Sequence, residues 1–211
     1  MHLENSISSR LRIAQYLIEN LHADEYIKSI NLEKYLQTKR HPIDTKGIHG
    51  NFGIMKIIKI LENNKIERWG LENIGSEKFK EKFSFDTEKS IKGIVKKKEK
   101  SEKIFDFIIY FNNIPIIAIE TNFYSTSGTK IGINQGEYTD LIQDIYNYNE
   151  KTGKNLLFIW VTDGNYWLTS DGEKRYNNLK GNYFKADHEL LNYNLFKEKL
   201  PILLEAIKNG E

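Results

Sequence analysis

Residues 104–124, IFDFIIYFNNIPIIAIETNFY, contain two apolar runs that predict a buried β-hairpin. The runs, 105–111 and 114–119, are rich in β-branched and aromatic residues, which favour strands. Asn112 and Asn113 join them, and asparagine tolerates the positive φ angles that a two-residue hairpin turn requires. We therefore expect two neighbouring antiparallel strands in the interior of the fold.

Two acidic residues interrupt this apolar hairpin. Asp106 opens the first strand and Glu120 closes the second, so the turn returns Glu120 to the end of the sheet that holds Asp106. A buried carboxylate is costly unless it is paired or binds a cation. Two convergent carboxylates offer the oxygen ligands that Mg²⁺ prefers, and a metal there would polarise a phosphate and activate a water. The pair predicts a Mg²⁺ site for phosphoryl chemistry, and Asn122 faces the same side by the period of two.

The remaining apolar patterns predict helices and one further strand. Residues 156–161 are too apolar to face water on either side, which favours a buried strand, and residues 190–208 are expected to close the chain as a helix interrupted or restarted at Pro201. Helical spacing predicts four more helices, over 8–22, 31–38, 52–62 and 134–150. The order predicts an α/β fold in which helices flank a mixed sheet.

Length and composition narrow the possible classes of protein. The 211 residues suit one domain or one and a half, and the net charge of +2 decides nothing about partners. The chain has no cysteine, which excludes disulfides, thiolate zinc sites and a cysteine nucleophile and fits a reducing cytoplasm. It has neither a long apolar run nor the apolar core of a signal peptide. We expect a cytoplasmic protein that does not span a membrane.

The acidic pair belongs to a pattern with a known resemblance. Asp106, Glu120 and Asn122 form D-x13-E-x-N, which resembles the PD-(D/E)xK nuclease signature with Phe105 in place of Pro and Asn122 in place of Lys. The segments ETNFYS at 120–125 and FIWVTDG at 158–164 are similar to the active-site strand and the next strand of DpnII/MboI-type restriction endonucleases.

This resemblance implies a restriction endonuclease-like (PD-(D/E)xK) fold with the activity of a type II site-specific deoxyribonuclease. Such an enzyme hydrolyses phosphodiester bonds in double-stranded DNA with Mg²⁺, in that family at GATC and usually as a homodimer. By position, Asp106 and Glu120 would be the metal ligands. Asn122 would stand in the place of the usual lysine, where its amide oxygen could orient the attacking water but supplies no positive charge. Lys130, eight residues on, is the candidate for that charge.

Family members carry a further acid on a helix ahead of the hairpin, in a Met-Glu pair that can assist the metal. The matching residues in this sequence are Met55 and Lys56. Either Glu62 takes that role, or the site has two acids only.

A lysine-rich stretch precedes the strand that bears Asp106. Residues 88–104, EKSIKGIVKKKEKSEKI, would lie beside a bound duplex, although a solvated loop or strand edge is the alternative. We expect its lysines to contact phosphates, which positions the backbone without reading sequence: Lys92, Lys96, Lys97 and Lys98. Base reading is expected from Ser125, Thr126 and Ser127.

The N-terminal part allows two domain divisions. In the first, a helical region at 1–44 precedes a nuclease core at 45–211. In the second, the helix at 52–62 and the segment 63–70 resemble the recognition helix and first wing strand of a winged-helix DNA-binding module, which would cover 1–75 and leave 76–211 as the nuclease. A soluble, metal-binding fragment 76–211 would support two modules, and an insoluble fragment would support one.

Two other functions remain open at this point. The chain could be a non-catalytic, sequence-specific DNA-binding protein in which Asn122 marks a lost lysine, or a structure-specific repair nuclease on the same fold. A supercoiled plasmid with Mg²⁺ separates the three. Discrete fragments would indicate a restriction enzyme, and binding without cutting would indicate a DNA-binding protein. Cleavage without a fixed pattern would indicate a repair nuclease.

Overall fold

The computed structural model describes residues 45–68, 81–96, 101–124, 128–184 and 188–210. The chain divides into two compact units, Met1–Lys46 and Gly47–Glu211, and almost all described residues belong to the second. The helices expected over 8–22 and 31–38 lie outside the described residues. Every helix in the described ranges is too short or too polar to span a bilayer.

A mixed six-stranded sheet forms the centre of the second unit. The strands follow the order β1-β2-β3-β4-β5-β6; β2, β3 and β4 pair antiparallel, whereas the β1–β2, β4–β5 and β5–β6 pairs are parallel. The predicted α/β fold is therefore confirmed. The elements are α4 (Thr45–Asn63), β1 (Glu67–Arg68), β2 (Phe83–Lys96), β3 (Ser101–Phe111), β4 (Ile114–Phe123), α5 (Thr129–Thr152), β5 (Leu157–Asp163), the 3-10 helix η3 (Asn165–Leu168), α6 (Ser170–Asn182), β6 (His188–Leu191) and α7 (Tyr193–Asn209).

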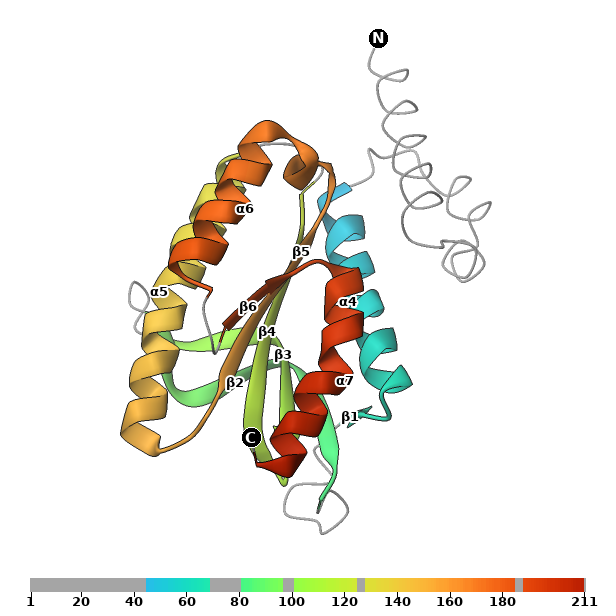
Figure 1. Cartoon of the computed structure of the whole chain (residues 1–211), viewed down its shortest axis with the longest axis vertical. Helices are drawn as coiled ribbons and strands as arrows, with labels where there is room; N and C mark the ends of the chain where they lie inside the picture. The colour runs from blue at the N-terminus through green and yellow to red at the C-terminus, as the bar shows by residue number, and fades with distance from the viewer. Residues whose placement is uncertain (1–44, 69–80, 97–100, 125–127, 185–187, 211) are drawn as a thin grey trace. The chain divides into compact units, whose positions relative to one another are not determined.

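Helices cover both faces of the sheet (Figure 1). One apolar cluster joins Ile108 and Ala118 of the central strands to α5 and α6. A second cluster joins Ile109 and Ile117, which are next to Ile108 and Ala118 in the sequence, to α4 and α7. Successive strand residues face opposite sides, so a strand covered on both faces is apolar at nearly every position. This explains the unbroken apolar runs in the sequence.

The hairpin turn has the geometry that its sequence predicts. Asn112 and Asn113 have φ angles of 52° and 63°, both in the left-handed region that a two-residue turn needs. The first strand differs from the prediction at its other end. β3 already begins at Ser101, so Asp106 lies in the middle of this strand and does not open it. The additional residues pair with β2, which the lysine-rich stretch helps to form.

The C-terminal third departs from the prediction in three places. The first two residues of the helix expected over 190–208 belong to strand β6, and α7 begins at Tyr193 after Asn192, whose side chain accepts a hydrogen bond from Leu195 N–H. The helix then continues through Pro201 without interruption. Helix α6 was not predicted, because it buries one large apolar side chain, Leu179, and thus lacks an apolar periodicity.

Helix α4 packs directly on the sheet. Ile57 and Leu61 on its buried side are fully buried, as is Ile66 (1% exposed) just after the helix, and all three share one cluster with Phe107 of β3 and Phe196 of α7. A helix that supplies this much of one sheet face is part of the same core. This packing supports the division into 1–44 and 45–211, which we retain as a proposal.

Replacing Leu61 with alanine tests whether α4 is part of the nuclease core. Because Leu61 is fully buried against the sheet, we expect Leu61→Ala to lower the free energy of unfolding of the whole core by about 2–5 kcal/mol. Met55→Ala on the same helix is the control, since Met55 is 52% exposed. Urea unfolding followed by tryptophan fluorescence measures both. A Leu61→Ala variant in which the sheet keeps its wild-type stability would favour the winged-helix division.

Candidate active site

Asp106 and Glu120 lie opposite each other on neighbouring strands. β3 and β4 are antiparallel and pair Ile108 with Ala118. Asp106 lies two residues before Ile108 and Glu120 two residues after Ala118, so the same register puts the acids opposite each other. Both paired residues belong to the cluster on the α5 side, and the alternation of strand side chains puts the acids on that face as well. Asp106 Oδ2 accepts a hydrogen bond of 2.8 Å from Thr121 N–H. The structure thus brings the two carboxylates together on one face of the sheet.

Both carboxyl groups hold their protons more tightly than usual. Burial raises the pKa of Glu120 to about 7, and the charge of Asp106 adds to this effect while Lys103 opposes it. Burial also raises the pKa of Asp106, against the hydrogen bond from Thr121. Two neighbouring acids, of which one is buried and the other partly buried, are costly when both are ionised. The pair is therefore a place where an added cation is stabilising.

Lys103 is a third charged residue at this pair, and sequence reasoning missed it. Its ammonium lies 3.0 Å from Glu120 Oε1 and 2.9 Å from Glu137 Oε1, and the side chain is only 7% exposed. Burial alone would lower its pKa, but Glu120 and Glu137 outweigh burial, so the pKa of Lys103 is raised. The ammonium also lies 5.8 Å from the ring centroids of Phe105 and Tyr138. Lys103 is therefore charged and held from several sides.

An irregularity in the sheet explains how Lys103 reaches the acids. Phe105 belongs to the cluster on the α5 side and Phe107 to the cluster on the α4 side, although residues two apart in a regular strand share a face. The strand therefore changes its facing between them, opposite Glu88 of β2, which has a φ of 54°. Such irregularities redirect side chains next to active sites. Here Lys103 and Asp106, three residues apart, both reach the α5 side.

Asn122 is fixed by two aromatic side chains. Its Oδ1 accepts hydrogen bonds of 3.0 Å from Trp160 Nε1 and from Tyr138 Oη. An indole N–H only donates, so the amide atom that faces Trp160 must be the oxygen. The amide NH₂ is then the end left for other contacts. This geometry differs from the expectation that the oxygen orients an attacking water.

Tyr138 connects Asn122 to Glu120. Its hydroxyl lies 3.0 Å from Glu120 Oε2 as well as 3.0 Å from Asn122 Oδ1. One hydroxyl hydrogen serves one acceptor at a time. With Glu120 ionised, Tyr138 donates to the carboxylate; with Glu120 protonated, the carboxyl can donate to Tyr138, which donates to Asn122. The same three groups therefore accommodate both protonation states of Glu120.

The other predicted site residues are more distant or fall outside the described residues. Lys130 is exposed at the start of α5, and its charge lowers the pKa of Asp106 without a direct contact between them in the structure. Lys92 is exposed on β2, and Lys96 ends that strand. Five predicted DNA-contacting residues lie outside the described ranges: Lys97, Lys98, Ser125, Thr126 and Ser127.

Glu62 does not join the acidic pair. It is exposed on α4, and α4 covers the face of the sheet opposite to the one that carries Asp106 and Glu120. The nearest further acid on the α5 side is Glu137, which reaches the pair through Lys103. The second option from the sequence, a site with two acids, fits this arrangement.

The end of the strand that bears Glu120 is tied to the following segment at Gly164. Tyr124 N–H donates to Asp163 O at 2.8 Å, and Tyr166 N–H donates to Tyr124 O at 3.1 Å. Gly164 lies between these contacts with a φ of 119°, and a Cβ there would lie 2.2 Å from Tyr124 O. Only glycine fits this close approach of two backbones.

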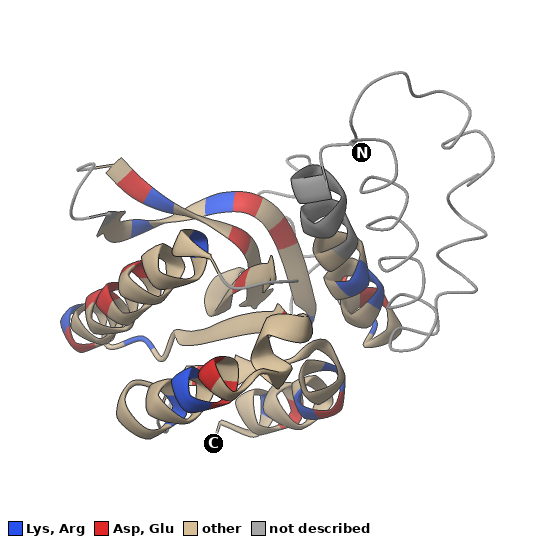
Figure 2. Cartoon of the chain, turned by 90° about the horizontal axis from the view of Figure 1, so that it is seen from above, with Lys and Arg blue, Asp and Glu red and all other residues tan. Residues whose placement is uncertain are grey.

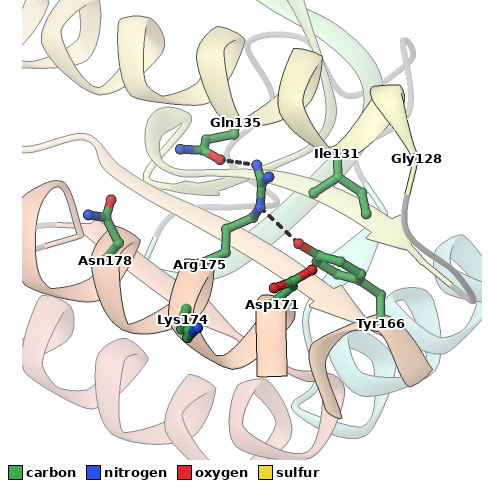
Figure 3. Close-up of a pocket in the computed structure, with 8 residues that line it drawn as sticks. All are labelled: Gly128, Ile131, Gln135, Tyr166, Asp171, Lys174, Arg175 and Asn178. Atoms are coloured by element: carbon green, nitrogen blue, oxygen red, sulfur yellow. Dashed lines mark hydrogen bonds between the residues drawn. The ribbon is translucent and has the colours of Figure 1, made fainter. Parts of the chain in front are cut away.

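A polar pocket of about 560 Å³ lies between α5 and α6 (Figure 3). Arg175 crosses it and donates hydrogen bonds to Gln135 Oε1 and, at 2.9 Å, to Tyr166 Oη. Asp171 is the one acid among its lining residues. The pocket therefore has no pair of carboxylates and is not where a metal-dependent reaction is expected. Its other lining residues are Gly128, Ile131, Lys174 and Asn178.

Charges of both signs are interspersed along the helices and along β2 in the described part of the chain (Figure 2). This agrees with the small net charge of +2. The acidic pair is thus distinguished by burial and contacts, and the surface charge does not point to it.

The donor set at the pair fits Mg²⁺. Within the described ranges, no three His, Cys, Asp or Glu side chains lie close enough together to hold a metal by themselves. Mg²⁺ is commonly bound by one or two carboxylates and completes its shell with water and substrate phosphates. Glu120 Oε1 is buried and, apart from its ion pair with Lys103, makes no hydrogen bond of acceptable geometry. Asp106 and Glu120 are therefore suitable ligands.

The part of the chain that carries this arrangement matches a known protein family. The model of the DpnII restriction endonuclease family matches residues 45–201, which include both carboxylates, Lys103 and all of the sheet. The chain belongs to this family. The match of this DpnII-family chain begins at the first residue of α4 and ends within α7.

Curated relatives resemble this DpnII-family chain over shorter stretches. The type II restriction enzyme MjaIII of Methanocaldococcus jannaschii is 37% identical over 103 residues, which is 48% of this chain and 32% of the relative. LlaDCHI of Lactococcus lactis subsp. cremoris is 39% identical over 74 residues, 34% of this chain and 23% of the relative. MboI of Moraxella bovis is 35% identical over 68 residues, which is 32% of this chain and 22% of the relative. The chain thus matches at most about a third of the length of these relatives, and no solved structure gives a significant match.

Stability in metal-free buffer should depend on pH through Glu120. Its pKa is raised in the folded state from an ordinary 4.5 to about 7, so the folded state binds the proton more tightly. The stabilisation is complete below pH 4.5 and is lost as the pH rises through 7, a loss on the order of 3 kcal/mol. We expect Glu120→Gln to remove most of this loss between pH 5 and 8, as measured by urea unfolding with a chelator present.

Glu198→Gln is the control for this experiment, because Glu198 is exposed on α7. Its stability should follow the wild-type pH dependence. If the curves of wild type and Glu120→Gln run parallel from pH 5 to 8, then Glu120 does not titrate as the structure implies.

Proposed function

We propose that the chain is a type II site-specific deoxyribonuclease that hydrolyses phosphodiester bonds in double-stranded DNA with Mg²⁺ held by Asp106 and Glu120. The observation that carries the proposal is the pair of carboxylates, Glu120 buried and Asp106 partly buried, that face each other across β3 and β4, within a chain of the DpnII restriction endonuclease family. Hydrolysis of a phosphodiester adds a water oxygen to phosphorus and breaks one P–O ester bond, and the leaving oxygen takes up a proton. Mg²⁺, when bound, would polarise the phosphate and lower the pKa of the attacking water.

The residues around the pair have separate tasks in this proposal. Tyr138 and Trp160 pack edge to face with ring centroids 4.8 Å apart and exclude water from one side of Glu120. They also fix Asn122 through its oxygen, which leaves the amide NH₂ to donate to the attacking water or a phosphate oxygen. Lys130, at the exposed start of α5, is assigned a phosphate contact.

The finer features of the function follow from the resemblance. The proposed recognition sequence is GATC or a similar short site. The proposed assembly is a homodimer, which would place one reaction centre on each strand. Ser125, Thr126 and Ser127 are the first candidates for base contacts. The pocket between α5 and α6 is lined by Gly128, which directly follows these three residues, and by Gln135. Because amide side chains can pair with base edges, Gln135 is a further candidate for a base contact. A chain without cysteine fits the cytoplasm.

Cleavage of a plasmid with known GATC sites, prepared without DNA methylation, tests the proposal. We expect discrete fragments in Mg²⁺ and none with a chelator. Asp106→Asn and Glu120→Gln should each lower the rate at least about a thousandfold, because each removes a charged ligand, yet both should still bind the duplex in Ca²⁺. Mapping the fragment ends identifies the recognition sequence.

Asp140→Asn provides the matched control, since Asp140 is an exposed acid on α5; it should cut at the wild-type rate. Binding without cutting by the wild type would favour a non-catalytic DNA-binding protein, and cutting without a fixed pattern would favour a repair nuclease. Wild-type rates in both variants of the pair would mean that the metal lies elsewhere.

Salt dependence of DNA binding tests the lysine-rich stretch. If Lys92 contacts a phosphate, Lys92→Ala should reduce the slope of log K against log salt by about one without changing which sequence is cut. Lys151→Ala is the control, because Lys151 is exposed in the last turn of α5, at the opposite end from Lys130. Titrations in Ca²⁺ between low and moderate salt give the slopes. An unchanged slope for Lys92→Ala would mean that Lys92 is solvated and does not contact a phosphate.

A further inference from the structure

The acidic pair has a buried cation that the sequence pattern does not account for. Asn122, at the position of the motif lysine, is neutral, and Lys130 is exposed at the start of α5. Lys103, in contrast, has its ammonium 3.0 Å from Glu120 Oε1. Burying a lysine costs solvation and side-chain entropy, so a lysine held at this place calls for an explanation.

We propose that Lys103 of β3 is the catalytic lysine of this site and supplies the positive charge that Asn122 lacks. This inference rests on the proposed function and adds to it the residue that meets the phosphate. In a sheet the charge need not come from the strand that carries Glu120. The change of facing between Phe105 and Phe107 lets the neighbouring strand deliver it to the same carboxylate.

Two kinds of contact hold the ammonium in place, ion pairs and contacts with aromatic rings. It forms ion pairs with Glu120 and, at 2.9 Å, with Glu137 of α5, and it lies against the rings of Phe105 and Tyr138. A group held from β4, from α5 and from its own strand has little freedom to move. Preorganised charge of this kind stabilises the charge that develops on a phosphate far better than a mobile surface lysine does.

The contact with Glu120 also predicts an effect on metal binding. Both the ammonium and a metal ion are attracted to the same carboxylate, and they repel each other. Removing the ammonium should therefore leave the metal affinity unchanged or raise it, while the rate of cleavage falls. A lysine that only stabilises the fold would show neither this opposition nor a loss confined to the chemical step.

The test compares Lys103→Met with wild type in three measurements on the full chain. We expect cleavage in Mg²⁺ to fall by at least about a hundredfold, duplex binding in Ca²⁺ to stay within about threefold, and Mn²⁺ binding by calorimetry without DNA to be equal or tighter. Lys151→Met is the control lysine and should match wild type in all three.

A double variant and a second single variant complete the test. Lys103→Met combined with Asn122→Lys returns a lysine to the motif position, and cleavage should recover at least about tenfold over Lys103→Met alone. Glu137→Gln leaves Lys103 in place and removes a half-exposed anchor, so it should fold normally and lose rate without losing duplex affinity. It therefore keeps the proposal testable even if Lys103→Met unfolds.

The outcomes separate this inference from the proposed function. If wild type cuts no DNA, the proposed function fails. If wild type cuts and Lys103→Met or Glu137→Gln cuts equally fast, the nuclease stands and the role of Lys103 is wrong. Loss of cleavage in Lys130→Met together with full activity in Lys103→Met would assign the charge to Lys130. Failure of the double variant to recover activity, with metal binding weakened in Lys103→Met, would reduce Lys103 to a structural ion pair.

Discussion

The whole site depends on one constraint, which is that two carboxylates, one buried and one partly buried, lie next to each other within a sheet. Asp106 and Glu120 face each other from adjacent strands, under a helix, with burial raising the pKa of both. Such an arrangement is unfavourable by itself and is tolerated when positive charge is close. Lys103 provides one such charge in the structure, and a divalent ion would provide a second. The aromatic surroundings strengthen this dependence because they keep water away from Glu120.

Helix α5 organises the chemistry around that pair. Tyr138 donates to Glu120 or Asn122, and Glu137, the residue before it, holds the ammonium of Lys103. One turn earlier, Asn134 donates to the hydroxyl of Tyr124, just beyond the strand that carries Glu120. A single helix therefore sets the positions of the acid, the amide and the lysine relative to each other. This is why most of its inward-facing residues are polar or aromatic near the site and aliphatic further along, at Leu141 and Ile145.

The sequence was sufficient for the parts of the fold that depend on local pattern. The apolar runs on either side of Asn112 and Asn113 predicted the hairpin, and helical spacing predicted α4 and α5. The acids were conspicuous because few charged residues occur in such runs. Lys103 was not found, since regular alternation puts it and Asp106 on opposite faces, and only the change of facing opposite Glu88 brings them together. Strand β6 was missed because its pairing with β5 defines it, and helix α6 was missed because it buries a single leucine. Neither feature leaves a periodic pattern in the sequence.

The close approach at Gly164 has a consequence for how sequence variation in this protein is interpreted. Any larger residue there would collide with the backbone of Tyr124 and displace the end of β4, two positions beyond Asn122. A random mutagenesis screen scored on activity should therefore return position 164 as intolerant, with a severity similar to that of the acids themselves. Intolerance at this glycine would reflect the alignment of a strand, and it should not be taken as a sign of contact with DNA.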